Sequence, residues 1–514
     1  MATAAGYAWQ LNIAGKILAR LKSNIIFNFL GSAWLGLLTL AVTPIQVHYL
    51  GVEAFGFVGL ITILQVLLGS LDLGIAATVT KIVSSDHSDQ RKDSADALNT
   101  ASTVYWCIAL VIAVLLWINS SRVAAFWLTS TRLDPETVAL GIQIIALYLG
   151  LRWPVAFYAG VIGGLQRMDI LNIVKASTNS LRLVGGALVL FFISDLIAFL
   201  VWFAISSFVE ILIYAVVTYR LLPILRRWPM FSLVSFKSIW KYSVALNFIA
   251  LTGLILSQAD RLAVTKLLTL EALGYYSIAY NASIAIALAQ SAINSATFPA
   301  FSHSFSSGQY VDLFLRYQKA CQLMGFVLAL PCFALIFFGH DVLSVWINAS
   351  AAKEAALTMS LLAFGFFLNS MVSSAHMIAL ACGQTRLPLS VNLVAPFLYV
   401  PILFWLVPAY GIDGAAAAYV CLSIYYVFTL LPLVQSTVIK QRTWMWLRSN
   451  LFPFAFAGII AFGVAKILSF TVQPGLQALM FLALGAVGYV IVASYLLSDS
   501  LRADFGSAIM RIFR

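Results

Sequence analysis

Residues 195–217 read DLIAFLVWFAISSFVEILIYAVV, an apolar stretch whose only interior charge is Glu210. A helix of roughly 20 apolar residues crosses the ~30 Å hydrocarbon core of a bilayer, so this stretch is long enough to span a membrane. Similar stretches recur from near residue 25 to near residue 498, and 62% of the 514 residues are hydrophobic while only 10% are charged. The sequence therefore predicts an all-α polytopic membrane protein with almost no chain left for a soluble domain.

About fourteen transmembrane helices are expected from these stretches. The first seven lie near residues 25–48, 54–78, 99–118, 137–164, 171–193, 195–217 and 242–265. The other seven lie near residues 273–300, 320–347, 355–381, 388–408, 412–437, 450–469 and 474–497. Because fourteen is an even number, both ends of the chain are predicted to share one side of the membrane.

The distribution of basic residues gives the orientation, since short cytoplasmic loops are rich in Lys and Arg. Most of the 30 Lys and Arg residues fall on the side of the termini, and the opposite side holds only Arg122, Arg132, Lys266, Lys353 and Lys466. Both termini, including an N-terminal segment of residues 1–24, are therefore predicted to be cytoplasmic. The same scatter over short loops explains the net charge of +11 without a nucleic-acid partner.

An internal repeat indicates two related halves. Residues 50–57 read LGVEAFGF and residues 268–275 read LTLEALGY, with a Glu, an Ala and a Gly in register. An even number of predicted spans separates the two copies, which therefore share one orientation, as in a parallel repeat of two transporter halves. Chance similarity of two short turns is the alternative.

The repeat gives the predicted domain boundaries. Helices 1 to 6 form an N-terminal lobe and helices 7 to 12 a C-terminal lobe, and two further helices follow. The boundaries are the N-lobe at 25–217, a cytoplasmic inter-lobe loop at 218–241, the C-lobe at 242–437, the last two helices at 450–497 and a cytoplasmic tail at 498–514. None of the hydrophilic stretches between spans is long enough to fold as a catalytic domain.

Several charged residues lie inside predicted spans, where a charge is costly unless it faces protein or water. They are Arg152, Arg182 and Arg261 together with Asp72, Glu210 and Asp260. One interpretation is that the arginines line a wet cleft and bind an anionic group such as a pyrophosphate, because guanidinium groups bind phosphate oxygens bidentately. The other is that the carboxylates neutralise the arginines and fix helix packing, and the carboxylates are also candidates for proton or ion coupling.

Uncharged polar residues also lie at depth in the predicted spans, and they are Gln258, Asn281, Gln290, Asn294, Asn369 and His376. They are candidates for contacts to sugar hydroxyls, although such groups more often bridge helices. The sequence has no Walker-type phosphate loop and no HExxH or GxSxG motif, so no cofactor, metal site or catalytic residue is expected. Coupling to protons or sodium ions stays open.

Four stretches resemble a known family. They are SLDLGIAATVTK at 70–81, GGLQRMDILN at 163–172, SQADRLAVTKLLTLEALGYYSIAY at 257–280 and NSATFPAFS at 294–302. Together they are similar to the polysaccharide-biosynthesis branch of the multidrug/oligosaccharidyl-lipid/polysaccharide (MOP) exporter superfamily, and especially to O-antigen flippases. The similarity covers most of the first ten helices, although helix 1 has none of the arginines expected of a lipid II flippase.

The resemblance implies a fold, a substrate and motif residues. The fold is a two-lobed, MATE-like bundle with a cationic cleft, and no enzymatic step is implied. The substrate is undecaprenyl-pyrophosphate-linked oligosaccharide, moved from the cytoplasmic to the periplasmic leaflet, with membrane lipids and other polysaccharide-assembly proteins as further candidate partners. Asp72, Asp260 and Arg261 carry over as motif residues, whereas Arg152 and Arg182 are inferred from their depth alone.

Other functions stay open at this point. A drug/cation antiporter of the MATE type would need acidic walls around its cavity, whereas these spans contain three deep arginines. A membrane polysaccharide polymerase or glycosyltransferase would need a long periplasmic loop with catalytic groups, and the predicted loops are short. A purely structural scaffold is hard to reconcile with arginines inside the membrane.

Overall fold

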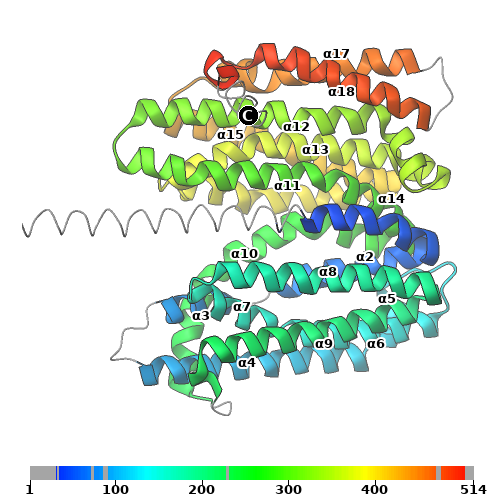
Figure 1. Cartoon of the computed structure of the whole chain (residues 1–514), viewed down its shortest axis with the longest axis vertical. Coiled ribbons are helices and arrows are strands. Elements are labelled where there is room, and N and C mark those ends of the chain that lie inside the picture. Colours follow the sequence, from blue (N-terminus) through cyan, green and yellow to red (C-terminus); the bar gives the residue numbers. More distant parts are fainter. Residues whose placement is uncertain are drawn as a thin grey trace, which may run out of the picture. The chain divides into compact units, whose positions relative to one another are not determined.

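The computed structural model of the chain describes residues 31, 34–70, 74–84, 91–226, 231–469 and 476–503. Within these residues helices are the only regular secondary structure (Figure 1). The predicted N-terminal segment 1–24, Asp72 and most of the predicted tail lie outside the described residues.

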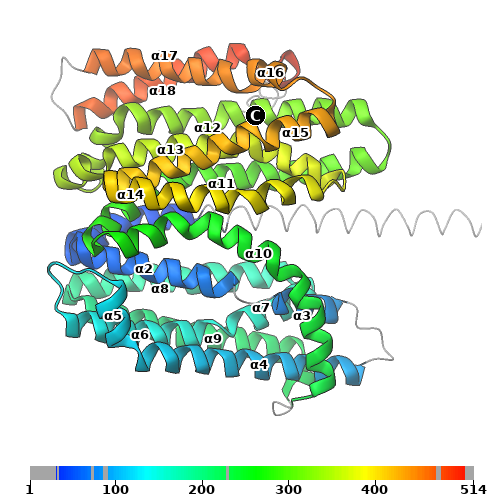
Figure 2. The same cartoon turned by 180° about the vertical axis from the view of Figure 1, so that it is seen from behind.

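Long helices make up most of the described chain (Figures 1 and 2). A helix over Trp34–Leu50 comes first. The helices that follow are α2 (Val52–Ser70), α3 (Ile75–Ser84), α4 (Arg91–Ile118), α5 (Ser120–Trp127), α6 (Pro135–Arg152), α7 (Val155–Gly164), α8 (Met168–Ile193), α9 (Leu196–Leu221), η1 (Pro223–Arg226), α10 (Leu233–Leu267), α11 (Leu270–Ser306), α12 (Tyr310–Trp346), α13 (Ala349–Ala381), α14 (Arg386–Phe428), α15 (Leu430–Val434), η2 (Gln435–Ile439), α16 (Thr443–Trp446), η3 (Leu447–Leu451), α17 (Phe452–Ser469) and α18 (Leu476–Leu496).

Eleven helices in the described part of the chain are long and apolar enough to cross a membrane. The prediction of an all-α, multi-pass membrane protein is therefore confirmed, whereas the number fourteen stays a prediction. One continuous helical stretch, Arg386–Ile439, contains two of the predicted spans. The two spans are separated at Gly411, which has a φ of 61° and a ψ of −137°. Glycine adopts this backbone conformation readily, whereas other residues would be strained in it.

Polar side chains mark the starts of three long helices. The Asp195 carboxylate accepts a hydrogen bond of 2.8 Å from the Ala198 amide at the start of α9. Asn348 caps α13 and Thr269 caps α11 in the same way. Each cap satisfies a backbone donor that the first helical turn leaves without a partner.

The chain divides into two compact units. Unit 1 contains the described residues up to Ile45 together with Leu64–Phe126 and Asp134–Leu251. Unit 2 contains Gln46–Ile63, Trp127–Leu133 and the described residues from Thr252 onwards. The division departs from the predicted lobes because the first part of α2 groups with the second unit. The predicted inter-lobe loop 218–241 also contains the start of α10, at Leu233.

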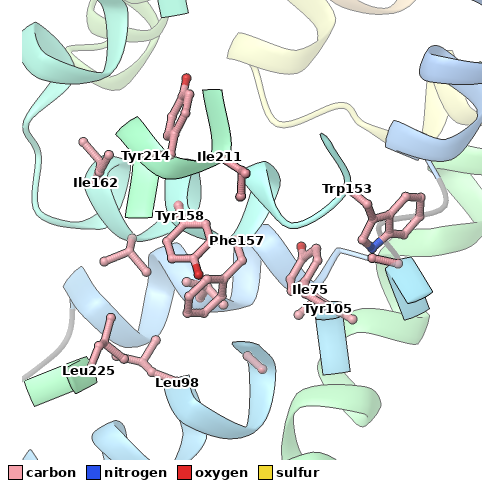
Figure 3. Close-up of a cluster of buried hydrophobic side chains, with 14 of the residues drawn as sticks. Ile75, Leu98, Tyr105, Trp153, Phe157, Tyr158, Ile162, Ile211, Tyr214 and Leu225 are labelled. Carbon is pink, nitrogen blue, oxygen red and sulfur yellow. The ribbon is translucent and has the colours of Figure 1, made fainter. Parts of the chain in front are cut away.

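In unit 1, α7 packs against α3, α4 and α9. Phe157 and Tyr158 of α7 lie in a buried apolar cluster with Tyr105 of α4 and Tyr214 of α9 (Figure 3). The ring centroids of Tyr105 and Phe157 are 5.9 Å apart. Close packing of this kind holds helices together in a bilayer, where lipid is as apolar as the side chains. The cluster fixes α7 and, with it, the chain just after α6.

A proline divides the predicted span 137–164 into α6 and α7. Pro154 has no amide hydrogen and its ring crowds the preceding turn, so it breaks the regular helix. The Trp153 amide makes the last bond of α6, 2.9 Å to the Leu149 carbonyl oxygen. Arg152 is consequently the last residue of α6, at a break in the helix in the middle of a predicted span. A cavity lies beside this break.

In unit 2, α13 packs against α11, α12 and α14, and α17 and α18 pack against α12 (Figures 1 and 2). Lys466 of α17 donates a hydrogen bond of 2.6 Å to Asp341 of α12, whose side chain is 3% exposed. The last two helices are therefore attached to this unit by an ion pair as well as by apolar packing.

The first part of α2 packs on α11 through two glycines of the internal repeat. A Cβ on Gly56 would lie 1.9 Å from the Leu270 carbonyl oxygen, and a Cβ on Gly274 would lie 2.1 Å from the Val52 carbonyl oxygen. Positions 56 and 274 are equivalent in the two repeats, and so are 52 and 270. The contact is therefore reciprocal, as between two like segments about a twofold axis, which supports the predicted repeat. It also explains why these residues of α2 belong to unit 2.

The glutamates of the same repeats hold the segment 127–133. The Glu53 carboxylate accepts hydrogen bonds from the amides of Thr131, at 2.6 Å, and of Arg132, at 2.8 Å. Glu271 lies 3.6 Å from the Arg132 guanidinium. Both repeats thus contact one connection between helices, which accounts for its place in unit 2.

Candidate functional site

Three ionised side chains from three helices of unit 1 come together. Arg182 lies in the middle of α8, Glu210 in the middle of α9, and Arg152 at the end of α6. The Arg182 and Glu210 side chains are 4% and 2% exposed and form a direct hydrogen-bonded ion pair. The predicted membrane charges at these three positions are therefore neighbours in the structure.

The guanidinium of Arg182 is bound on all of its sides by protein. Its Nη2 donates to Glu210, its Nε donates to the Ser206 hydroxyl at 3.2 Å, and its Nη1 donates to Asn179 Oδ1 at 3.1 Å. A buried arginine with these partners serves to join α8 and α9. The structure gives Arg182 the pairing role that the sequence left as one of two interpretations.

Arg152 is bound more loosely and faces a cavity. Its Nη1 lies 3.6 Å from Glu210 Oε2 and donates a hydrogen bond of 3.1 Å to the Tyr148 hydroxyl. That hydroxyl donates in turn to Gln65 Oε1 at 2.8 Å. The Arg152 side chain is 19% exposed, compared with 4% for Arg182. The cavity has a volume of about 240 Å³ and is lined by Gln65, Leu68, Gly69, Leu149, Arg152, Trp153, Val155 and Ala156.

The electrostatics of this cluster follow from two guanidinium groups that share one carboxylate. The sum of the three charges is positive by one unit, and the less tightly paired cation is the one at the cavity. Inside a protein the attraction between charges is screened less than in water, so a single excess charge has a strong effect. The cavity can therefore attract an anion, and phosphate and carboxylate oxygens are the groups that a guanidinium binds bidentately.

Asp260 and Arg261 lie on α10 in unit 2 and are buried, at 3% and 7% exposure. Asp260 Oδ2 accepts a hydrogen bond of 2.6 Å from the Tyr276 hydroxyl, while Oδ1 has no hydrogen-bond partner among the described residues. The Arg261 guanidinium stacks on the Tyr280 ring, 3.4 Å from its centroid. These two motif residues are thus held by tyrosines of α11 through a hydrogen bond and a cation–π contact.

A second cavity, of about 270 Å³, lies in unit 2. Three of the six predicted sugar contacts, Gln290, Asn369 and His376, line it. Asn294 adjoins it, because its Nδ2 donates a hydrogen bond of 3.2 Å to the lining residue Ser373. Four of the six predicted residues therefore lie in or beside this cavity, and Gln258 and Asn281 are not among its lining residues.

Sequence reasoning missed several residues of these sites. Tyr148 lies four residues before Arg152 on α6, and this spacing, which places two side chains on one helix face, was an available signal. Gln65, on α2, and the pair Asn392 and Tyr426, both on α14, meet their partners only through tertiary packing. No local spacing in the sequence predicts that these three residues belong to the sites.

Potential metal ligands in the described part of the chain do not form a cluster. No group of three or more His, Cys, Asp or Glu side chains there could hold a metal ion. The five cysteines all lie within it and are unpaired, with Cys321, Cys332 and Cys382 buried and Cys107 and Cys421 exposed.

Comparison with known proteins identifies the family. The family model described as "Polysaccharide biosynthesis protein" matches residues 21–305, which is more than half of the chain. The chain belongs to this polysaccharide-biosynthesis protein family. A Shigella flexneri protein provisionally named an O-antigen transporter is 20% identical over 397 residues, covering 77% of this chain and 93% of its own length.

Solved structures with the same fold are transporters and flippases. The lipid II flippase MurJ in an inward closed conformation matches with a TM-score of 0.76 at 13% identity, over 92% of this chain and 98% of its own. A MATE transporter of Vibrio cholerae matches with a TM-score of 0.58 at 15% identity, over 84% and 99% of the two chains. The fold is therefore that of the MOP superfamily, as the sequence motifs predicted.

Proposed function

We propose that this protein is a flippase that moves undecaprenyl-pyrophosphate-linked oligosaccharide, a surface-polysaccharide repeat unit, from the cytoplasmic to the periplasmic leaflet of a bacterial inner membrane. The observation that carries the proposal is Arg152, a half-paired guanidinium that faces a cavity in the middle of a helical span. Membership of a polysaccharide-biosynthesis family and the provisional name of the Shigella flexneri relative support the same substrate class.

A diphosphate is the part of such a substrate that Arg152 would bind. Its linkage oxygens carry negative charge, and a hydrogen bond between ionised groups contributes about 1.5 to 3 kcal/mol. Glu210 keeps the site from being too strongly cationic, because it neutralises one of the two guanidiniums. A site with one net positive charge can bind the diphosphate in one leaflet and still release it in the other.

The sign of the charge also separates this proposal from drug/cation export. A cationic drug would be repelled by the excess positive charge beside the Arg152 cavity. Within the described part of the chain, Glu210 is the carboxylate of this cluster, and it is held by Arg182 and is 2% exposed. The charge cluster of unit 1 therefore favours an anionic substrate over a cationic one.

Alternating access supplies the mechanism, since a rocking motion exposes one binding site to the two leaflets in turn. The glycine contact between α2 and α11 joins the two repeat segments, and we propose that it parts in the opposite state of this cycle. The polyprenyl tail stays in lipid while the pyrophosphate and sugars cross.

For energy coupling we propose Asp260 and not Glu210. Asp260 is buried with one carboxylate oxygen that has no hydrogen-bond partner in the described part of the chain, so a proton or sodium ion would complete its environment. Glu210 already forms ion pairs with Arg152 and Arg182. No other cofactor is needed.

The proposal is tested by complementation of a strain in which the gene is deleted. Wild-type protein and Arg152→Lys should restore surface polysaccharide in full or in part, and Arg152→Gln should leave lipid-linked repeat units on the cytoplasmic leaflet. Arg122→Gln is the matched control, because Arg122 is exposed and its guanidinium donates a hydrogen bond to the neighbouring Asn119. Full export by a normally inserted Arg152→Gln protein would overturn the proposal.

A further inference from the structure

The cavity of unit 2 is built from four helices. Its lining residues are Gln290 of α11, then Asn369, Val372, Ser373, His376 and Met377 of α13, Asn392 and Tyr426 of α14, and Leu430 of α15. All of these helix segments lie toward the ends that share a side with Arg386 and Lys440, which the charge distribution predicts to be cytoplasmic. The cavity is thus at the side from which a lipid-linked substrate would be loaded.

Hydrogen-bonding groups in this cavity are left unused by the protein. Gln290 Oε1 accepts from the Ser370 hydroxyl at 2.8 Å, and Asn392 Oδ1 accepts from the Tyr426 hydroxyl at 3.0 Å. These bonds orient the two amides and leave both NH₂ groups available. The Asn369 and His376 side chains make no hydrogen bond within the described residues. Polar groups without partners are costly inside a membrane, so these groups need water or a polar ligand.

The lining carries no fixed charge. No Lys, Arg, Asp or Glu residue is among the residues that form this cavity. Amide groups offer donors and acceptors together, which suits hydroxyl groups because each hydroxyl also donates and accepts. Tyr426 and the apolar residues Val372, Met377 and Leu430 offer surface for C–H groups. This mixture matches an uncharged sugar ring and contrasts with the cationic cavity at Arg152.

The size of the cavity accommodates a small part of the substrate. Its volume is about 270 Å³, which is enough for one sugar ring.

We infer that this cavity is a subsite for one uncharged sugar residue of the transported glycan, oriented by the amides of Gln290, Asn369 and Asn392. The inference rests on the proposed flippase function. It adds a second binding site, which recognises a sugar ring and is separate from the site that binds the diphosphate. The two sites then make different demands on the substrate: Arg152 requires the diphosphate, and the amide-lined cavity requires a neutral ring.

Binding to purified protein in nanodiscs separates the two sites. The probes are undecaprenyl pyrophosphate without sugar, and the lipid-linked repeat unit extracted from a strain that lacks this protein. Asn369→Leu should weaken binding of the repeat unit about five- to tenfold, the range expected for one or two lost neutral hydrogen bonds, and leave the sugar-free probe unchanged. Leu357→Met, at an exposed position of the same helix α13 and outside the cavity lining, is the matched control and should affect neither probe.

Each outcome decides between the two claims. If Asn369→Leu weakens both probes equally, or neither, the sugar subsite is rejected while the flippase proposal stands. If Arg152→Gln leaves binding of the sugar-free probe unchanged, the phosphate site of the flippase proposal fails. Asn392→Leu provides a second variant, and thermal unfolding of each protein verifies that it is folded, so a misfolded Asn369→Leu does not end the test.

Discussion

Arg182 and Glu210 illustrate how a membrane protein accommodates buried charge. Both side chains are nearly inaccessible, and the pair is completed by hydrogen bonds from Arg182 to Ser206 and Asn179. Breaking such a pair is costly because the remaining charge is left without compensation. The carboxylate matters more than either arginine, since both arginines pair with it.

This asymmetry predicts the effect of Glu210→Gln. The change leaves two guanidiniums close together without a counter-charge, and we expect a loss of about 3 to 5 kcal/mol in the free energy of unfolding. Thermal unfolding in detergent measures the loss. The double variant Glu210→Gln with Arg182→Gln should recover part of it, because it removes the uncompensated charge.

Glu136→Gln is the control for this prediction, since Glu136 is exposed in the first turn of α6. It should unfold like the wild type. Equal stability of Glu210→Gln and Glu136→Gln would show that the cluster contributes nothing to folding.

The sequence showed which charges lie at depth in the spans but not how they pair. Glu210 and the two arginines stand out from apolar surroundings, so their importance was predictable from the cost of burying a charge. Whether Glu210 faces Arg182, Arg152 or neither depends on the rotation of α8 and α9 about their axes. Helices that are apolar on nearly all sides carry no periodic signal that fixes this rotation.

Among the helices, the contact between α2 and α11 offers the most direct control of the transport cycle. Gly59 and Ser277 occupy equivalent positions of the two repeats and face each other. A Cβ placed on Gly59 would lie 3.5 Å from Ser277 Cβ. That separation falls within the usual Cβ to Cβ range of a disulfide, about 3.5 to 4.5 Å.

The pair Gly59→Cys and Ser277→Cys should therefore form a disulfide on oxidation. Under the proposal that this contact parts during alternating access, the cross-linked protein should stop exporting polysaccharide, and a reductant should restore export. Each single cysteine variant is a control and should export under oxidising conditions. Export by the fully cross-linked protein would mean that this contact stays closed throughout the cycle.

Some features of the helices were predictable and others were not. The helices at α8, α9, α17 and α18 follow from length and hydropathy, and their predicted ranges agree closely with the observed ones. The break between α6 and α7 could have been read from Pro154, which disfavours an uninterrupted helix. The early start of α10 could not, because Lys237 and Lys241 interrupt the apolar pattern there. The helix begins in a polar stretch that hydropathy assigns to a loop.

For the whole molecule, the orientation in the membrane is predicted by charge alone. Lys353 lies at the start of α13 and Arg442 just before α16, on opposite sides in the predicted topology, and both are exposed. In a protein without its five native cysteines, Lys353→Cys should react with a membrane-impermeant maleimide added to intact spheroplasts. Arg442→Cys should react only after the membrane is opened, and the reverse pattern would invert the topology.

The two-unit organisation was predictable in outline from the internal repeat, but its boundary was not. The sequence placed residues 25–217 in one lobe, whereas residues 46–63 pack with the second unit because two glycines bring α2 against α11. A repeat shows that two segments are alike. Only the packed structure shows that they touch each other.

In the proposed transport cycle, Arg152 binds the diphosphate of a lipid-linked oligosaccharide during its passage across the bilayer. The most direct measurement uses proteoliposomes with this lipid in one leaflet and follows its exposure to an impermeant glycosidase on the other side. Wild-type protein should expose the sugar, and Arg152→Gln should do so about 10- to 100-fold more slowly, as the loss of a charge-assisted hydrogen bond implies. Equal rates for the two proteins, both folded and inserted, would contradict the account.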